Sequence, residues 1–207
     1  EIPTTGSFNE YIATLSKSNR RKLYNSRKAL DSLGETQVQT ITLDRLNELS
    51  AHLNKFTQER WGQIALQSHK IEFIKKLAEN SGYSITGILL SVGNEVLACT
   101  LNIEANGRCY YMLLGFSEKT IKGVSLGILT VGFDIERCFK DKSTTHYDLL
   151  AGGGKNTNYK KHIATEGAGF ESIKVIRNRK LTPLYRIKDM LSLIKKGIGS
   201  KTQNQNE

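Results

Sequence analysis

The sequence predicts an α/β fold (α+β, with a mixed sheet), and three patterns in the chain indicate it. Apolar residues recur at helical spacing in the first third of the chain and again around 126–138. Three strand-like runs joined by short turns fill the middle, at 83–116. A strand, a short helix, a last strand and a helix then follow one another. We therefore expect one sheet with helices packed against it.

The first third of the chain is expected to be mostly helical. The expected elements are a helix over 7–33, a strand over 36–41, a helix from 42 or 44 to about 61, and a helix over 68–82. Ser7 is a suitable N-cap for the first helix, and Gly34 ends it. The strand prediction rests on the alternating run "TQVQTI".

The rest of the chain is expected to form the sheet and the helices that cover it. The runs "YSITGILLSV", "EVLACTLNIE" and "RCYYMLLGF" predict three antiparallel strands, because "GN" and "ANG" between them are hairpin turn signals. The later elements are expected as a helix through 128–138, a strand at 146–151, a short helix at 159–163, a strand at 170–178 and a helix from Pro183.

Composition and charge narrow the classes of function. No apolar run approaches the roughly 20 residues that cross a bilayer. The first residues have neither the basic start nor the apolar core of a signal peptide, so we expect a cytoplasmic protein. Lys and Arg number 30 against 20 Asp and Glu, a formal net charge of +10. This balance suits an anionic partner such as a nucleotide phosphate, a nucleic acid or an anionic surface, and it also suits a basic surface without a partner.

The three cysteines, Cys99, Cys109 and Cys138, are scattered along the chain. They show no C-x-x-C spacing and no pairing with the four histidines, so we expect no metal site. We expect reduced thiols, two in strands and one on a helix. Cys109 as an acyl-accepting nucleophile is an alternative that no histidine fixed near it in the sequence supports.

The stretch "HYDLLAGGGKNTNYKKH" at 146–162 raises the question of a phosphate-binding loop. A Walker loop is excluded, because Gly154-Lys155 is followed by Asn156 and Leu149 stands where the first glycine belongs. The dinucleotide fingerprint fails because no acidic residue closes a βαβ unit after it. The stretch "IKGVSLGIL" suits an anion better: it precedes a helix, whose N-terminus offers unpaired N–H groups, and its glycines let a pyrophosphate approach the backbone.

Lys122, Ser125 and Gly127 in that stretch form the pattern K-x-x-S-x-G. The pattern resembles the Q/R-x-x-G-x-G/A loop with which the GNAT superfamily of acyl-CoA transferases holds the CoA pyrophosphate. The order of the expected elements is also similar to that of the GNAT fold. Small residues at a helix start also serve packing alone, and that reading stays open beside the first.

Three further stretches resemble the BioF-like (CelD-like) acetyltransferase branch of GNAT proteins, a relative of the FemAB-type peptidyltransferases. "GSFNEYIATLSKSNRRKLYNSRKAL" resembles the helix with a basic block that precedes that domain, and "LNKFTQERWG" resembles a helix ending in Arg-Trp. "YDLLAGGGKNTNYKKHI" resembles its strand and glycine loop, although the loop is longer here and Leu149 replaces an aromatic residue. The matching positions are Arg60, Trp61, Tyr147, Asp148, Gly152, Tyr159 and Lys160.

The resemblance implies a single GNAT-like domain over 1–198, as the C-terminal half of a longer chain, followed by a disordered polar tail at 199–207. It implies acyl-CoA, such as acetyl-CoA, as co-substrate and a small-molecule or glycan amine as acceptor, for example an amino sugar or an amino acid of envelope or exopolysaccharide metabolism. The donor-binding residues would be Lys122, Gly123, Ser125, Leu126 and Gly127. The acceptor-binding residues would be Trp61, Tyr111, Gly152, Lys155 and Lys160.

Acyl transfer from a thioester to an amine needs a polarised carbonyl, a neutral amine and a proton for the leaving thiolate. A backbone N–H where the strand at 108–116 parts from its neighbour could polarise the carbonyl. Asp148 and Glu104 are the candidate catalytic carboxylates, and Tyr159 or Tyr111 could protonate the thiolate. Asp148 suits an ion pair with Lys160 equally well.

Two other functions stay open. The basic block of Arg20, Arg21, Lys22, Arg27 and Lys28 suits a solvated helix face, the 3′-phosphate of CoA, an anionic glycan or a tRNA backbone. An aminoacyl-tRNA donor, as in FemAB-type relatives, is therefore an alternative to acyl-CoA. A non-catalytic GNAT module is the other alternative. The sequence does not fix the oligomeric state.

Overall fold

The computed structural model describes residues 1–80, 82–150, 157–167, 183–185, 187 and 190. The chain divides into two compact units, Glu1–Ala168 and Gly169–Glu207, and the fold described here is that of the first. The expected strand at 170–178 and the tail at 199–207 lie outside the described residues. In the expected C-terminal helix, residues 183–185, 187 and 190 are helical. The domain boundary at 198 stays a prediction.

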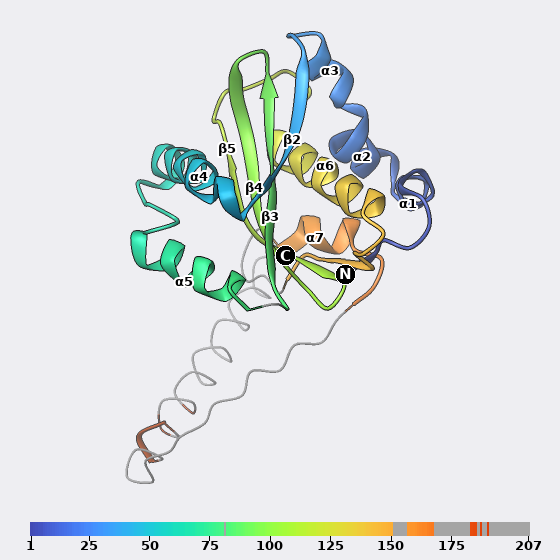
Figure 1. The fold of residues 1–207 in the computed structure, drawn as a ribbon. Helices are drawn as coiled ribbons and strands as arrows, with labels where there is room; N and C mark the ends of the chain where they lie inside the picture. Colours follow the sequence, from blue (N-terminus) through green and yellow to red (C-terminus); the bar gives the residue numbers. More distant parts are fainter. Residues whose placement is uncertain (81, 151–156, 168–182, 186, 188–189, 191–207) are drawn as a thin grey trace. The chain divides into compact units, whose positions relative to one another are not determined.

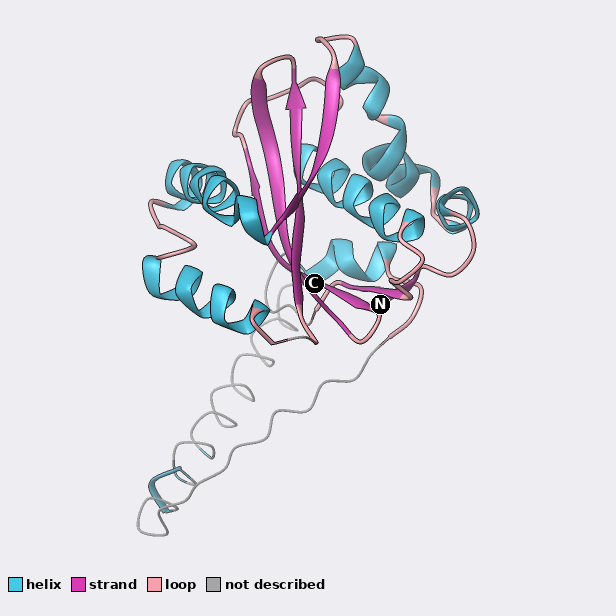
Figure 2. Cartoon of the chain, in the orientation of Figure 1, coloured by secondary structure: helices cyan, strands magenta, loops and turns pink. Residues whose placement is uncertain are grey.

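Six strands form one mixed sheet within the described residues, in the order β1-β6-β5-β4-β3-β2 (Figures 1 and 2). Their bounds are β1 Ile2–Pro3, β2 Thr36–Thr42, β3 Ser84–Val92, β4 Glu95–Ala105, β5 Arg108–Phe116 and β6 His146–Asp148. All neighbours pair antiparallel except β5 and β6, which are parallel. The expected three-stranded meander is therefore confirmed, and so is the mixed α/β fold class.

Strand β1 is an element that the sequence analysis missed. Ile2 pairs with Tyr147 of β6, and the Ile2 side chain is fully buried. A two-residue strand shows no alternation of its own, and its partner lies at the other end of the domain in sequence. Local patterns therefore cannot reveal it.

The expected single helix over 7–33 is wrong, because the segment forms four short helical pieces. These are α1 Phe8–Thr14, α2 Lys17–Arg20, a π-helical turn at Arg21–Asn25 (η1), and α3 Arg27–Asp31. Ser7 caps α1 in a full capping box with Glu10, as predicted for its N-terminus. The break follows from Ser16, whose side chain accepts a hydrogen bond from the Asn19 N–H and starts a new helix.

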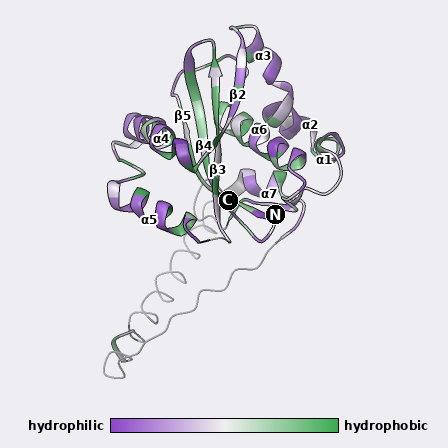
Figure 3. Cartoon of the chain, viewed as in Figure 1, coloured by the Kyte–Doolittle hydropathy of each residue, from purple (hydrophilic) through white to green (hydrophobic). Residues whose placement is uncertain are grey.

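The remaining helices are α4 Leu46–Trp61, preceded by a 3₁₀ turn at Leu43–Arg45 (η2), α5 Ser68–Ala78, α6 Leu126–Lys140 and α7 Thr157–Ile163. Helices α4 and α5 cover one face of the sheet, and α6 covers the other together with the N-terminal helices (Figure 1). In Figure 3 the central strands are mostly hydrophobic and the outer helices carry most of the hydrophilic surface. No helix in the described part of the chain is long and apolar enough to cross a membrane.

Strand β5 contains a β-bulge that changes which side chains face which layer. Leu113 pairs with Leu101 and Tyr111 with Asn102, so Met112 is left without a partner in β4. Tyr111 packs in the core cluster on the α6 side, whereas Leu113 packs in the cluster on the α4 side. In a regular strand both would face the same layer, because residues two apart point to the same side.

Candidate active site

A groove of about 900 Å³ runs along the edge of β5. It exists because β6 is short: the parallel pairing ends at Tyr110 with Asp148, so nothing in β6 covers β5 from Tyr111 to Phe116. Within the described part of the chain, this unpaired edge forms the floor of the groove and includes Met112 of the bulge. An unpaired strand edge presents backbone donors and acceptors to whatever lies in the groove.

Three other parts of the domain form the walls. One wall is the end of α4 and the loop after it, at 57–65, joined by Lys70 of α5. The facing wall is the loop at 117–121 together with the first turn of α6. Tyr159 and Lys160 of α7 line the groove beside Tyr111. Gly115 lets α4 approach the floor, because a Cβ there would lie 3.1 Å from Phe56 and 3.2 Å from Leu53.

Of the predicted donor-binding residues, Ser125, Leu126 and Gly127 line the groove, whereas Lys122 and Gly123 are not among its lining residues. Ser125 is the N-cap of α6, and its side chain makes no capping hydrogen bond. The first N–H groups of this 15-residue helix therefore have no side-chain cap and carry the partial positive charge of the helix end. Gly127 also has a packing role, since a Cβ there would lie 2.8 Å from the Phe116 ring.

Tyr111 and Tyr159 meet at the end of the groove near the bulge. Burial raises the pKa of Tyr159, and its hydrogen bond with Tyr111 acts in the opposite direction. Burial also raises the pKa of Tyr111, to which the nearby Tyr159 adds. Both phenols are thus protonated at neutral pH, and Tyr159 is the more exposed of the two. A protonated phenol in this position is able to give a proton to a leaving thiolate.

Asp148 and Lys160 hold the turn that ends β6. The Asp148 carboxylate accepts a hydrogen bond of 2.8 Å from the Leu150 N–H, and Leu150 has a left-handed backbone with φ of 56°. The Lys160 ammonium donates to the Leu149 carbonyl and, at 3.3 Å, to the Leu150 carbonyl. Burial lowers the pKa of Lys160, and the nearby Asp148 charge opposes this. The two residues interact electrostatically but form no direct ion pair among those found in the described residues.

Asp148 is buried and does not line the groove. Its contacts support the structural role that the sequence left open, since they stabilise the turn that ends β6. Lys160 of α7, which donates to this turn, does line the groove, with its ammonium 5.9 Å from the centre of the Tyr111 ring. Gly152 and Lys155 lie outside the described residues.

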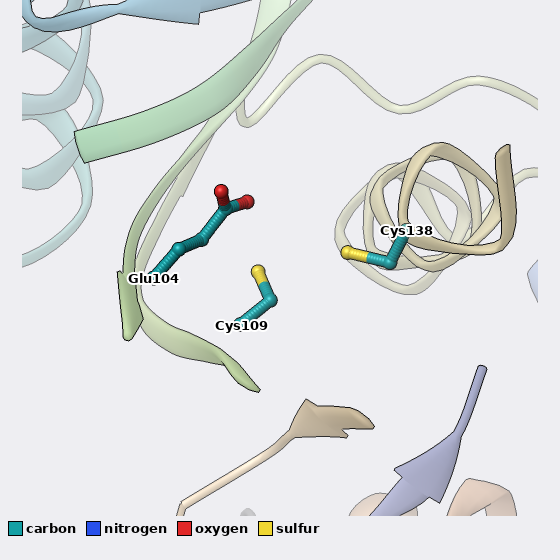
Figure 4. Close-up of side chains that lie close together, drawn as sticks. All are labelled: Glu104, Cys109 and Cys138. Atoms are coloured by element: carbon teal, nitrogen blue, oxygen red, sulfur yellow. The ribbon is translucent and has the colours of Figure 1, made fainter. Parts of the chain in front are cut away.

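Glu104 lies away from the groove, in a buried polar cluster behind β5. Arg137 of α6 is the centre of this cluster: its guanidinium is 2.8 Å from Glu104, 3.0 Å from Asp134 and 3.2 Å from the Cys109 sulfur. Figure 4 shows the Cys138 sulfur pointing from α6 toward Cys109 and Glu104 on the sheet. These two thiols and the carboxylate are close enough to share a metal ion. The guanidinium supplies the positive charge that they face.

The same cluster extends to Tyr147. Its hydroxyl donates to Asp134 at 3.0 Å, and the Asn102 side-chain amide donates to the same carboxylate oxygen at 2.7 Å. All three side chains are fully buried. Tyr147, a residue of the motif recognised in the sequence, therefore contributes to the core rather than to the groove, and its ring lies against that of Tyr111.

Trp61 lines the groove and is 56% exposed. Beside it, Arg60 lies over the Phe116 ring and forms an ion pair of 3.3 Å with Glu118, which joins the two walls. Among the described lining residues, Glu118 is the one acidic residue, against Arg60, Lys70, Lys119 and Lys160. The sequence analysis did not single out Met112, Phe116 or Glu118. The run that ends in "GFSEK" predicts a strand, but its sequence does not indicate that one edge of this strand lines a groove.

A family model described as "Acetyltransferase (GNAT) domain" matches residues 17–161. The chain belongs to the GNAT acetyltransferase family. The match includes the whole groove, the Arg-Trp helix end and the strand with its glycine loop as far as residue 161.

Solved structures share the fold at low identity. FemX aligns with a TM-score of 0.53 and 12% identity over 78% of this chain, and this chain spans only 57% of FemX. A possible acetyltransferase from Clostridium difficile 630 aligns with a TM-score of 0.46 and 14% identity, over 69% of this chain and 99% of that one. An aminoglycoside acetyltransferase from an uncultured soil metagenomic sample aligns with a TM-score of 0.46 and 10% identity, over 69% of this chain and 97% of that one. A search of curated proteins finds no match.

Proposed function

We propose that this GNAT domain transfers an acyl group from an acyl-CoA, acetyl-CoA in the simplest case, to an amine acceptor. The observation that supports it best is the groove itself. It joins the uncapped first turn of α6 to the bulge and the tyrosine pair along one uncovered strand edge. The motif matches in the sequence favour the BioF-like branch and, with it, an amino sugar or amino acid acceptor.

The proposed donor lies lengthwise in the groove. Its pyrophosphate binds at Ser125–Gly127, where the uncapped N–H groups of α6 point outward and the helix dipole favours an anion. Its pantetheine arm follows the β5 edge toward Met112, where its amide groups meet unpaired backbone groups. The four basic lining residues against one acidic residue suit this polyanionic ligand.

The proposed reaction takes place at the bulge. A backbone N–H near Met112 polarises the thioester carbonyl, because this residue lacks a strand partner in both β4 and β6. Tyr159, in contact with Tyr111 directly before the bulge, gives its proton to the leaving CoA thiolate. Trp61 offers an exposed indole face to the acceptor from the α4 wall.

The two predicted catalytic carboxylates are not placed to take the proton of the amine. Asp148 and Glu104 both have structural partners and neither lines the groove. Glu118 is the acidic residue that does, and its carboxylate is engaged by Arg60. We therefore propose that the acceptor binds as the neutral amine or loses its proton to water, with no carboxylate needed for the transfer.

Calorimetric titration with acetyl-CoA tests the donor, with a Ser125→Glu variant as the decisive comparison. The helix dipole stabilises a carboxylate at the N-terminus of α6. The Ser125 side chain makes no capping hydrogen bond that the substitution would remove, so we expect this variant to keep its fold. It places a negative charge where the pyrophosphate should bind. We expect heat of binding in the wild type and in Ser125→Ala, and binding at least about tenfold weaker in Ser125→Glu.

Absence of binding by the wild type would contradict the acyl-CoA donor, and aminoacyl-tRNA would be the next titrant. Equal binding by Ser125→Glu and Ser125→Ala would keep the donor and move its pyrophosphate away from α6. Gly127→Glu is a poorer test, because even a Cβ at this position displaces the Phe116 ring.

A further inference from the structure

Four cations of the N-terminal helical segment and one of the loop before α6 have no acidic partner among the described residues. They are Arg20, Arg21, Lys22, Lys28 and Lys122, which we call the basic patch, and none of them takes part in an ion pair. Arg27 differs, because it is partly buried, pairs with Glu136 and lies over the Phe133 ring. The partly buried Arg27 is thus neutralised by an ion pair, whereas the cations of the basic patch are not.

One of these cations lies at the donor loop. A Cβ built on Gly123 would be 3.7 Å from a terminal nitrogen of Arg21, so the guanidinium stands directly over this glycine. Gly123 has a left-handed backbone with φ of 80°, and Ile121, Val124 and Ser125 on either side of it line the groove. Arg21 therefore lies at the outer side of the same loop whose inner side faces the proposed donor.

The position of Arg21 is fixed by the fold rather than by a flexible loop. Arg21 begins the π-helical turn η1, and the backbone N–H and the hydroxyl of Ser26 both donate to its carbonyl, at 3.0 and 2.8 Å. The same hydroxyl is 3.2 Å from the Gly123 carbonyl, which ties the end of the turn to the loop. Single π-helical turns within a helix are rare and occur often at functional sites.

The chemistry of CoA supplies a group of matching charge. Besides the pyrophosphate, CoA carries a phosphomonoester on its ribose, with a charge of about −1.5 to −2 at neutral pH. If the pyrophosphate occupies Ser125–Gly127, the ribose phosphate lies further out, on the side of Lys122 and Gly123. Arg is the side chain best suited to a phosphate because its planar fork donates two parallel hydrogen bonds.

We propose that Arg21, assisted by Lys122, binds the 3′-phosphate of the acyl-CoA donor, so that the π-helical turn selects 3′-phosphorylated CoA over its dephosphorylated form. This inference rests on the proposed function. It gives the π-helical turn, Arg21 and Lys122 a role in recognising the donor that the groove alone does not explain.

The test compares the binding of CoA and of 3′-dephospho-CoA to the purified chain by calorimetry, at low and at moderate salt. The wild type should bind CoA about tenfold more tightly than dephospho-CoA, the size expected for one charge-assisted contact. Arg21→Gln should lose most of this preference by weakening CoA binding alone. Lys28→Gln removes the same charge from an exposed position on α3 and serves as the matched control, with both ligands bound as in the wild type.

Four results would overturn the inference. A wild type that binds both ligands equally would leave the acyl-CoA function standing and remove the 3′-phosphate site. If Arg21→Gln weakened the binding of both ligands equally, Arg21 would lie at the pyrophosphate instead. If Lys28→Gln lowered CoA affinity as much as Arg21→Gln, the patch would act only through its overall positive charge and not through a contact of Arg21. A wild type that binds neither ligand would refute both this inference and the proposed donor. Circular dichroism of each variant excludes unfolding as the cause.

Discussion

Gly132, in the middle of α6, allows a close approach between that helix and the N-terminal segment. A Cβ added there would lie 2.0 Å from the carbonyl oxygen of Leu23, whereas real Cβ atoms essentially never come within 3.0 Å. Leu23 is a fully buried residue of η1. Gly132→Ala would therefore require the two backbones to separate by at least 3.0 − 2.0 = 1.0 Å, because neither atom belongs to a flexible side chain.

Two opposing effects decide the magnitude. Ala in a helix interior is favoured over Gly by about 1 kcal/mol. Overpacking of a tight core costs typically 1–3 kcal/mol and more where backbone has to move. We expect Gly132→Ala to lower the free energy of unfolding by roughly 2 kcal/mol, a large part of the 5–15 kcal/mol typical of a domain.

The same helix supplies a matched control. A Cβ on Gly127 would lie 2.8 Å from an atom at the rim of the Phe116 ring, which moves more easily than a backbone carbonyl. Gly127→Ala should change stability by less than about 1 kcal/mol, because the helix propensity gained offsets the small displacement. Urea unfolding followed by circular dichroism measures both variants. If Gly132→Ala proved as stable as the wild type, the close approach of η1 to α6 would be refuted.

Three further results are expected. Tyr147→Phe should lower the free energy of unfolding by about 1.5–3 kcal/mol in urea unfolding, because it removes a hydrogen bond to the buried Asp134 carboxylate; a neutral effect would mean that this carboxylate finds another donor. Tyr159→Phe should lower kcat roughly 100-fold with little change in KM in a thiol-release assay, and a change in KM alone would assign Tyr159 to binding. The Asp141 carboxylate accepts hydrogen bonds first from the Ser143 hydroxyl, then from the Ser143 N–H and from Thr144, which lower its pKa below the usual 3.8. The stabilising effect of this ionised carboxylate is complete above pH 3.8 and is lost as pH falls through the lowered pKa. Asp141→Ala should therefore have a lower free energy of unfolding than the wild type at pH 6, and the difference should disappear on acidification. A difference that does not depend on pH would contradict this.

The sheet and its covering helices were largely predictable because their signals are local. Turn residues between alternating runs predicted β3 to β5, and helical spacing predicted α4, α5 and α6. The failures share a different cause. The short β1 depends on pairing with Tyr147 at the far end of the domain, and the breaks in the first helix depend on Ser16 competing with the helix backbone.

The candidate site was predicted in part, for a similar reason. Residues taken from motifs, such as Trp61, Ser125 and Tyr159, line the groove. For Asp148 the sequence leaves a catalytic and a structural role open, and its hydrogen bond with the N–H of the left-handed Leu150 depends on a backbone conformation that the sequence does not reveal. The bulge at Met112 and the meeting of Arg21 with Gly123 arise from register and helix packing, which no spacing in the sequence encodes.

The three buried thiols can report the order in which parts of this domain open to solvent. Cys99 lies in the middle of the sheet, and burial raises its pKa to about 12, so a thiol reagent reaches its thiolate only when β4 is exposed. Cys109 and Cys138 lie across the boundary between β5 and α6. Pulse labelling of the native protein with a thiol reagent would therefore rank the opening of the two layers without any introduced cysteine. Labelling of Cys138 ahead of Cys99 would mean that α6 leaves the sheet while the sheet itself stays folded.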